Sequence, residues 1–154
     1  MKRRTFLKGS LASGVLAVAA GAGLLKPDRV LAAAYPQAAF QTDISTEEAL
    51  KNSLGMSDVS DSGDIKIAAP LQAENGAVVP IKVETSLPAE AIAIIAVKNP
   101  SPLTTFVNLS GAGGFYSARI KMGQTSDVHA VVKSGGKLFK ATQQIKVTVG
   151  GCGG

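Results

Sequence analysis

A series of short strand patterns, separated by turn residues, constrains the fold of this 154-residue chain more than any other feature of its sequence. Apolar and polar residues alternate over 79–84, which is typical of a half-buried strand. Residues 91–97 are almost wholly apolar and predict a central strand. Asn75-Gly76 predicts a turn, Asn99-Pro100-Ser101-Pro102 breaks the chain, and Ser134-Gly135-Gly136 predicts a tight hairpin.

Strand patterns of this kind fill most of the second half of the chain. Several short strands with turn signals at regular spacing are typical of a sandwich. We therefore predict an all-β fold, an antiparallel immunoglobulin-like β-sandwich of about seven strands. The expected strands are 64–68, 79–84, 91–97, 104–110, 115–122, 127–133 and 137–149, the last of which is long enough to contain a bulge.

One short N-terminal helix is predicted ahead of these strands. Ser45 and Glu48 have the spacing of a capping box, in which each side chain accepts a hydrogen bond from the other residue's backbone. The helix should run from about Thr46 to Leu54 and end at Gly55. Residues 58–64 are expected to form a polar connection.

The first 34 residues have the layout of a secretory signal. A basic segment with the pair Arg3-Arg4 precedes an apolar stretch over 9–25, and the small residues Ala32-Ala33-Ala34 follow. The paired arginines favour the twin-arginine (Tat) route. We therefore predict a signal peptide over 1–34, cleaved after Ala34 or after Ala32, and a periplasmic protein with no stable membrane association after cleavage.

The charge balance changes once this segment is set aside. The chain has 16 Lys and Arg against 11 Asp and Glu. Six of the basic residues and one of the acids precede Tyr35, so ten of each remain. A mature part with no formal net charge gives no indication of nucleic-acid binding. One sandwich domain over 35–149 is the expected organisation.

The chain ends in Gly-Gly-Cys-Gly-Gly, and Cys152 is its only cysteine. Glycines offer no side chains for packing and cost the most entropy to order, so a buried structural cysteine is not expected here. Residues 150–154 are predicted to form a flexible arm that extends from the last strand. Its glycines give the thiol reach and access: Gly150, Gly151, Gly153 and Gly154.

No catalytic or cofactor-binding motif accompanies this thiol in the sequence. The spacings typical of zinc, haem and dinucleotide sites are absent, and Gly111–Gly114 is expected to be a loop between strands. His129, the only histidine, lies in an expected strand and faces away from Val128 and Ala130. An exposed or interfacial structural histidine is therefore favoured over a catalytic base. A nucleophile alone indicates a non-catalytic carrier, with no metal and no cofactor.

Other functions remain compatible with these residues. Cys152 could join a structural subunit to a partner through an intermolecular disulfide. Gly153-Gly154 could form a C-terminal thiocarboxylate, as in ubiquitin-like sulfur carriers, although the export signal and the strand pattern argue against this. A cysteine-dependent enzyme would use His129 as its base.

Four stretches of the chain carry a family resemblance: residues 73–80, 98–103, 118–122 and 146–154. The last contains the intact Gly-Gly-Cys-Gly-Gly terminus. Together they resemble the SoxY family, the sulfur-carrier subunits of the bacterial Sox thiosulfate-oxidation system. The resemblance covers nearly the whole mature chain and is strongest from Glu74 onward.

This resemblance implies a function and a set of partners. A SoxY-like protein works in a heteromeric complex with SoxZ and holds sulfur on its terminal cysteine, here Cys152, as S-thiosulfonate and persulfide. SoxXA, a c-type haem protein, couples thiosulfate to that cysteine. SoxB, a manganese hydrolase, then releases sulfate, and in some systems the molybdenum protein SoxCD oxidises the remaining sulfur. None of these steps requires a metal on the carrier itself.

Overall fold

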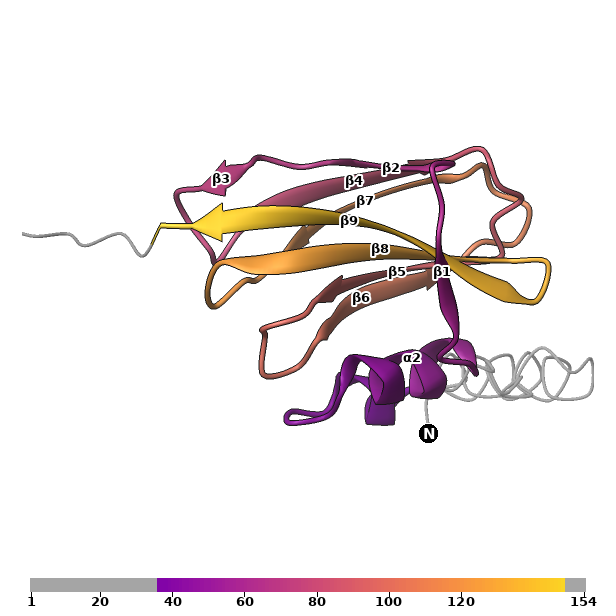
Figure 1. The fold of residues 1–154 in the computed structure, drawn as a ribbon, viewed down its shortest axis with the longest axis horizontal. Helices are drawn as coiled ribbons and strands as arrows, with labels where there is room; N and C mark the ends of the chain where they lie inside the picture. Colours follow the sequence, from indigo (N-terminus) through magenta and orange to yellow (C-terminus); the bar gives the residue numbers. More distant parts are fainter. Residues whose placement is uncertain (1–35, 149–154) are drawn as a thin grey trace, which may run out of the picture. The chain divides into compact units, whose positions relative to one another are not determined.

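The computed structural model of this chain describes residues 36–148, which form two short helices followed by nine strands (Figure 1). The signal peptide expected over 1–34 and the arm expected over 150–154 lie outside these residues. The elements are η1 (Gln37–Phe40), α2 (Thr46–Leu54), β1 (Val59–Asp61), β2 (Ile65–Ala68), β3 (Gln72–Ala73), β4 (Val79–Thr85), β5 (Ala91–Ala96), β6 (Leu103–Asn108), β7 (Phe115–Ile120), β8 (Ser126–Ser134) and β9 (Lys137–Val147).

The strands form two packed sheets, which confirms the predicted β-sandwich. The larger sheet has the order β1-β9-β8-β5-β6, and β3 also pairs with β9. The smaller sheet has the order β2-β4-β7. In Figure 1 the helix α2 lies on the side of the larger sheet that faces away from the smaller one. No helix in residues 36–148 is long and apolar enough to cross a membrane.

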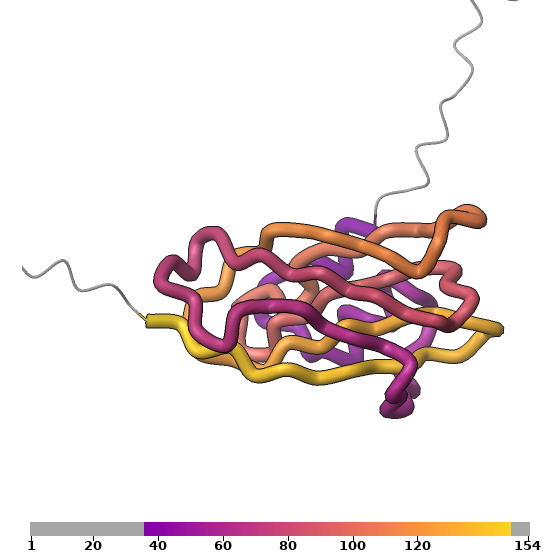
Figure 2. Tube along the Cα trace, turned by 90° about the horizontal axis from the view of Figure 1, so that it is seen from above, coloured from indigo at the N-terminus to yellow at the C-terminus, as the bar shows by residue number. Residues whose placement is uncertain are grey.

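The structure differs from the prediction along the outer edge of β9. Residues 59–61, expected to be part of a polar connection, form β1 and pair in parallel with β9. The strand β3 also pairs in parallel with β9, so the sandwich is antiparallel apart from these two short pairs. Figure 2 shows the chain that contains them running alongside β9. Two or three residues are too few to show the alternation by which a strand is recognised in a sequence.

The strand β9 is continuous where a bulge was expected. It pairs with β8 in one register, from Ser126 opposite Ile145 to Ser134 opposite Lys137. The hairpin between β8 and β9 was predicted and is confirmed. Gly135 and Gly136 have φ angles of 55° and 70°, the positive values that a two-residue hairpin turn requires.

The strand β5 is buried along its whole length because both faces of the larger sheet are covered there. Ile92, Ile94 and Ala96 pack in the core between the sheets, whereas Ala91, Ala93 and Ile95 pack with residues of η1 and α2. Burial of an isoleucine side chain contributes about 2 kcal/mol to folding. The unbroken apolar run in the sequence therefore reflects two cores that share one strand.

The helix α2 has the limits that its capping residues predict. The Ser45 hydroxyl accepts a hydrogen bond from the Glu48 amide at 3.1 Å, and Glu48 Oε2 accepts one from the Ser45 amide at 3.2 Å. Gly55 ends the helix with a φ of 83°. The helix then presents Ala49, Leu50 and Leu54 to the larger sheet.

Candidate functional site

The candidate site is the end of the sandwich at which β9 terminates, here called the arm end. Cys152, Gly150, Gly151, Gly153 and Gly154 lie outside the described residues, so their roles stay predictions. The structure does show the segment from which they continue, Lys146, Val147 and Thr148, here called the arm root.

Hydrogen bonds hold the arm root on both of its sides. Toward β3, the Lys146 amide donates to the Leu71 carbonyl at 2.9 Å, and the Thr148 amide donates to the Ala73 carbonyl at 3.1 Å. On the other side the Val147 amide donates to the Thr125 hydroxyl at 3.0 Å. The course of the backbone is therefore set as far as Thr148.

The turn at Asn75-Gly76 packs directly against the arm root. The Asn75 carboxamide oxygen accepts a hydrogen bond from the Ala77 amide at 2.9 Å, and the Met122 amide donates to the Gly76 carbonyl at 2.7 Å. A Cβ atom on Gly76 would collide with the Met122 carbonyl and would lie 2.8 Å from a methyl carbon of Val147. Only glycine fits this position without a shift of the arm root or of the neighbouring loop.

The loop after β5 is tied to the same region through Asn99. Its side-chain nitrogen donates to the Lys121 carbonyl at 2.7 Å, and its side-chain oxygen accepts from the Gly123 backbone amide at 3.1 Å. The neighbouring Lys98 amide donates to the Ser126 hydroxyl at 3.0 Å. Both hydrogen-bonding groups of Asn99 are thus used to join two loops.

The four stretches that carry the family resemblance therefore converge at the arm end. Residues 73–80, 98–103, 118–122 and the described part of 146–154 are joined there by the contacts above. The sequence indicated each stretch separately but not their meeting, which depends on which strands pair. The one sequence signal was that each stretch lies beside a predicted strand end.

The arm end carries an excess of positive charge. Lys98, Arg119, Lys121 and Lys146 are exposed, against the three acids Asp43, Glu74 and Asp127. Within residues 36–148 the one salt bridge joins Lys140 to Asp61 at 3.9 Å, so the four cations at the arm end are unpaired there. Such a surface favours anionic ligands and acidic partner surfaces.

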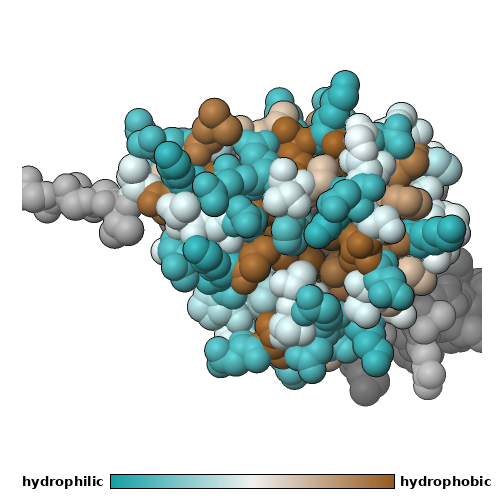
Figure 3. All heavy atoms as spheres, in the orientation of Figure 1, coloured by the Kyte–Doolittle hydropathy of each residue, from teal (hydrophilic) through white to brown (hydrophobic). Residues whose placement is uncertain are grey.

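Exposed apolar side chains also gather at this end. Of the four large apolar side chains exposed in the described part of the chain, Leu71, Val78 and Val97 belong to the arm end and Phe115 to the opposite end. Leu71 is 75% exposed, next to the arm root. Figure 3, seen from the same direction as Figure 1, shows hydrophobic residues interspersed with hydrophilic ones on that face of the molecule.

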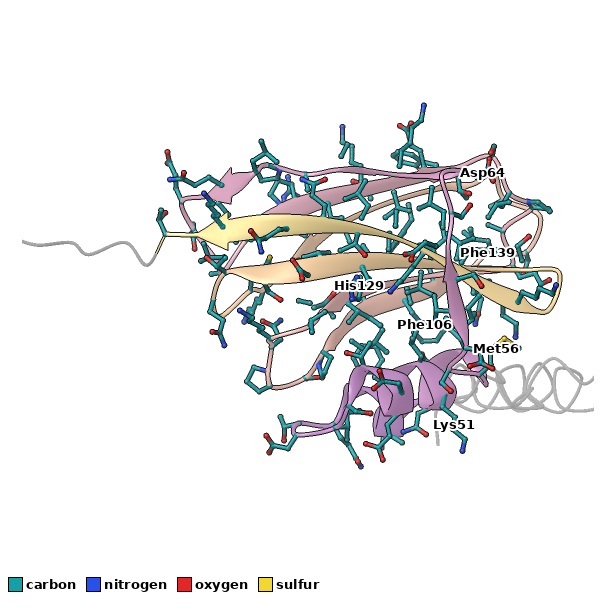
Figure 4. The ribbon with its side chains drawn as sticks, in the orientation of Figure 1. Lys51, Met56, Asp64, Phe106, His129 and Phe139 are labelled. Atoms are coloured by element: carbon teal, nitrogen blue, oxygen red, sulfur yellow. The ribbon has the colours of Figure 1, made fainter. Side chains whose placement is uncertain are left out.

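His129 lies on β8, on the face of the larger sheet covered by α2 (Figure 4). Its Nδ1 atom is 2.8 Å from the Thr142 hydroxyl on β9. Burial lowers its pKa below the usual 6.5, and Lys140 lowers it further, while Asp127 and Asp61 oppose this effect. Alternation predicted that His129 faces away from Val128 and Ala130, and the structure confirms this, since those two residues pack in the core between the sheets. The hydrogen-bond partner of His129 is a hydroxyl rather than a carboxylate.

The glycine-rich segment Gly111–Gly114 joins β6 to β7, as predicted, at the end of the sandwich opposite the arm. A Cβ atom on Gly114 would collide with the Thr85 carbonyl at the end of β4. This close approach explains why a glycine is required at position 114. In residues 36–148 no three His, Cys, Asp or Glu side chains are grouped as metal ligands would be.

Two solved structures show how this chain resembles known proteins. The sulfur carrier protein SoxY from Chlorobium limicola f thiosulfatophilum is 40% identical, with a TM-score of 0.54, over 59% of this chain and 84% of that chain. The superoxide reductase (neelaredoxin) from Ignicoccus hospitalis is 17% identical, with a TM-score of 0.46, over 55% of this chain and 80% of that chain. This second likeness is too weak to carry an argument.

A family model, described as "Sulfur oxidation protein SoxY", matches residues 50–152. The matched region contains nearly all of the described fold and reaches Cys152. No curated protein sequence matches the chain. The match over most of the chain, together with the solved SoxY structure, shows that this protein belongs to the SoxY family of sulfur oxidation proteins.

Proposed function

We propose that this protein carries sulfur intermediates of thiosulfate oxidation as covalent adducts on Cys152, and that it is not itself an enzyme. The observation that carries the proposal is the family match, which extends to Cys152. The solved SoxY structure, itself described as a sulfur carrier, supports the same role.

The loading step is an oxidation. The Cys152 thiol loses its proton, since the thiolate is the reactive species. Its sulfur forms a bond to the outer sulfur of thiosulfate, and two electrons pass to a c-type haem partner of the SoxXA type. The product is the S-thiosulfonate Cys–S–S–SO₃⁻.

The release step is a hydrolysis carried out by a SoxB-type partner. Water adds to the terminal sulfonate, the bond between that sulfur and its neighbour breaks, and sulfate leaves with two protons released. Cys152 then holds a persulfide, which a SoxCD-type partner oxidises where it is present. In this scheme the carrier supplies the attachment point, and the partners supply every metal.

The role of the sandwich in this scheme is to present the arm. The arm root is held by hydrogen bonds up to Thr148, and the four residues from there to Cys152 span at most about 14 Å when extended. A partner with a narrow channel can therefore admit the thiol while the sandwich stays outside.

We further propose a periplasmic location after Tat export and a stable complex with a SoxZ-like subunit. Partners of the SoxXA, SoxB and SoxCD types would bind transiently. The exposed side chains of Leu71, Val78 and Val97 support contact with a partner at the arm end.

The proposal is tested by the intact mass of the protein isolated from thiosulfate-grown cells, before and after treatment with reductant. We expect sulfur-containing adducts that the reductant removes and that are absent from Cys152→Ser. Ser110→Ala, at an exposed residue, is the matched control and should keep the adducts. A disulfide-linked protein without added sulfur would instead indicate a structural subunit.

A further inference from the structure

A cavity of about 490 Å³ opens at the arm end, between the start of β6 and the end of β7. Each of these strands is the last of its sheet, so the cavity lies on an open side of the sandwich. Thr42, from the segment between η1 and α2, and Ser101, from the loop after β5, also line it.

The charged side chains that line this cavity are Arg119 and Lys121, and no carboxylate lines it. A cavity at the opposite end has Asp64 and Glu84 beside Lys66 in its lining. The acid nearest in sequence to the arm-end lining is Asp43, whose amide donates to the Pro100 carbonyl at 2.8 Å. Two cations without a lining anion make the cavity favourable for a negatively charged ligand.

The spacing of the two cations suits one small anion. Ile120, between them, is only 3% exposed and packs into the core between the sheets. Because side chains alternate along extended backbone, Arg119 and Lys121 start on the other side of that strand, about 7 Å apart. Neither makes a salt bridge within residues 36–148. A tetrahedral oxyanion between them could accept two hydrogen bonds from the guanidinium and one from the ammonium group.

The neutral groups of the lining divide into occupied and available donors. The Ser101 hydroxyl donates to the Phe40 carbonyl at 3.0 Å, and the Thr104 hydroxyl donates to the Ile94 carbonyl at 2.8 Å. The Thr42 side chain is exposed and has no hydrogen-bond partner in the described part of the chain. The Asn99 side-chain nitrogen is also occupied, because it donates to the Lys121 backbone carbonyl. Arg119, Lys121 and Thr42 are therefore the donors left for a ligand.

From this lining we propose that the cavity binds a sulfur oxyanion through its –SO₃⁻ group. The choice of sulfur among possible anions rests on the proposed carrier function. The group has two sources: free thiosulfate or sulfite, and the S-thiosulfonate adduct on Cys152. The strand β6 is three strand spacings, about 14 Å, from β9, and this distance is similar to the length of extended chain between Thr148 and Cys152.

The free anions are tested by titrating Cys152→Ser protein with sodium thiosulfate, sulfite or sulfate while the amide NMR signals of Asn99, Lys121 and Gly123 are followed. Sodium chloride keeps the ionic strength constant. We expect saturable shifts, and binding weakened roughly five- to tenfold in Arg119→Gln or Lys121→Gln. Lys137→Gln, at an exposed cation of the opposite end, should bind as before. Unsaturable shifts, or equal weakening in Lys137→Gln, would overturn the proposal for free anions.

The tethered source is tested with tetrathionate on the wild-type protein. The Cys152 thiolate attacks a central sulfur, thiosulfate leaves, and Cys–S–S–SO₃⁻ remains without any external oxidant. After desalting, shifts at Lys121 and Gly123 that vanish in Arg119→Gln would show that the adduct occupies the cavity. Their absence, together with a negative titration, would refute the inference. The carrier function is judged separately, because adducts in cells are measured by mass whether or not this cavity binds.

Discussion

The two ends of the sandwich are built alike but charged differently. Each has one glycine pressed against a carbonyl of another segment: Gly76 against Met122 at the arm end, and Gly114 against Thr85 at the opposite end. The arm end has four unpaired cations against three acids, whereas the ten basic and ten acidic residues after residue 34 balance overall. Close packing therefore stabilises both ends. The arm end differs from the opposite end in its positive charge and in carrying the arm root.

The largest effect is expected from Gly76→Ala. The added Cβ collides with the Met122 carbonyl and crowds Val147, and we expect the free energy of unfolding to fall by about 1–3 kcal/mol in chemical denaturation. Because Val147 belongs to the arm root, adduct formation per folded molecule should fall as well. Gly123→Ala is the control at the same end, since no atom lies within 4 Å of the new Cβ.

Gly114→Ala makes the same change at the opposite end. The collision with the Thr85 carbonyl should again lower the free energy of unfolding by about 1–3 kcal/mol, with Gly113→Ala as the neutral control. Adduct formation per folded molecule, measured by intact mass, should stay at the wild-type level. An equal loss of loading in both variants would show that the two ends do not differ in function.

A smaller effect is expected from Thr125→Val, which removes the hydroxyl that accepts the Val147 amide. An unsatisfied amide costs about 1 kcal/mol, and the arm root should exchange its amide hydrogens faster. Thr142→Val removes a hydroxyl of the same kind beside His129 and should leave exchange at Val147 unchanged. Similar exchange in the two variants would contradict the anchoring role of Thr125.

The smallest effect concerns pH and His129, which belongs to neither end. Its pKa is lowered in the folded state, mainly by burial, so the unfolded chain binds the proton more tightly. Its stabilising contribution is complete above pH 6.5 and declines as the pH falls through 6.5 toward the lower folded pKa. Denaturation curves at several pH values should show this decline, and His129→Gln should reduce it. If the free energy of unfolding depends on pH in the same way in His129→Gln as in the wild type, groups other than His129 cause the decline.

Local signals in the sequence predicted the local parts of this structure. The capping box at Ser45 set the start of α2, the glycine pair at 135 and 136 marked the hairpin, and the apolar run of β5 marked an interior strand of the larger sheet. The strands β1 and β3 could not be predicted, because they exist only through pairing with β9, more than 70 residues later in the chain. The cavity beside Arg119 depends on the same kind of distant contact.

The unbroken pairing of β9 with β8 has a mechanical consequence. In the proposed function, a partner that holds the chain beyond Thr148 would pull along the axis of β9, while the hydrogen bonds to β8 lie across that axis. The nine residue pairs from Ser126–Ile145 to Ser134–Lys137 are then loaded in shear and share the force, instead of being peeled apart one at a time. If the proposed function holds, the sandwich would therefore resist tension applied at its C-terminal strand when a partner releases the chain beyond Thr148.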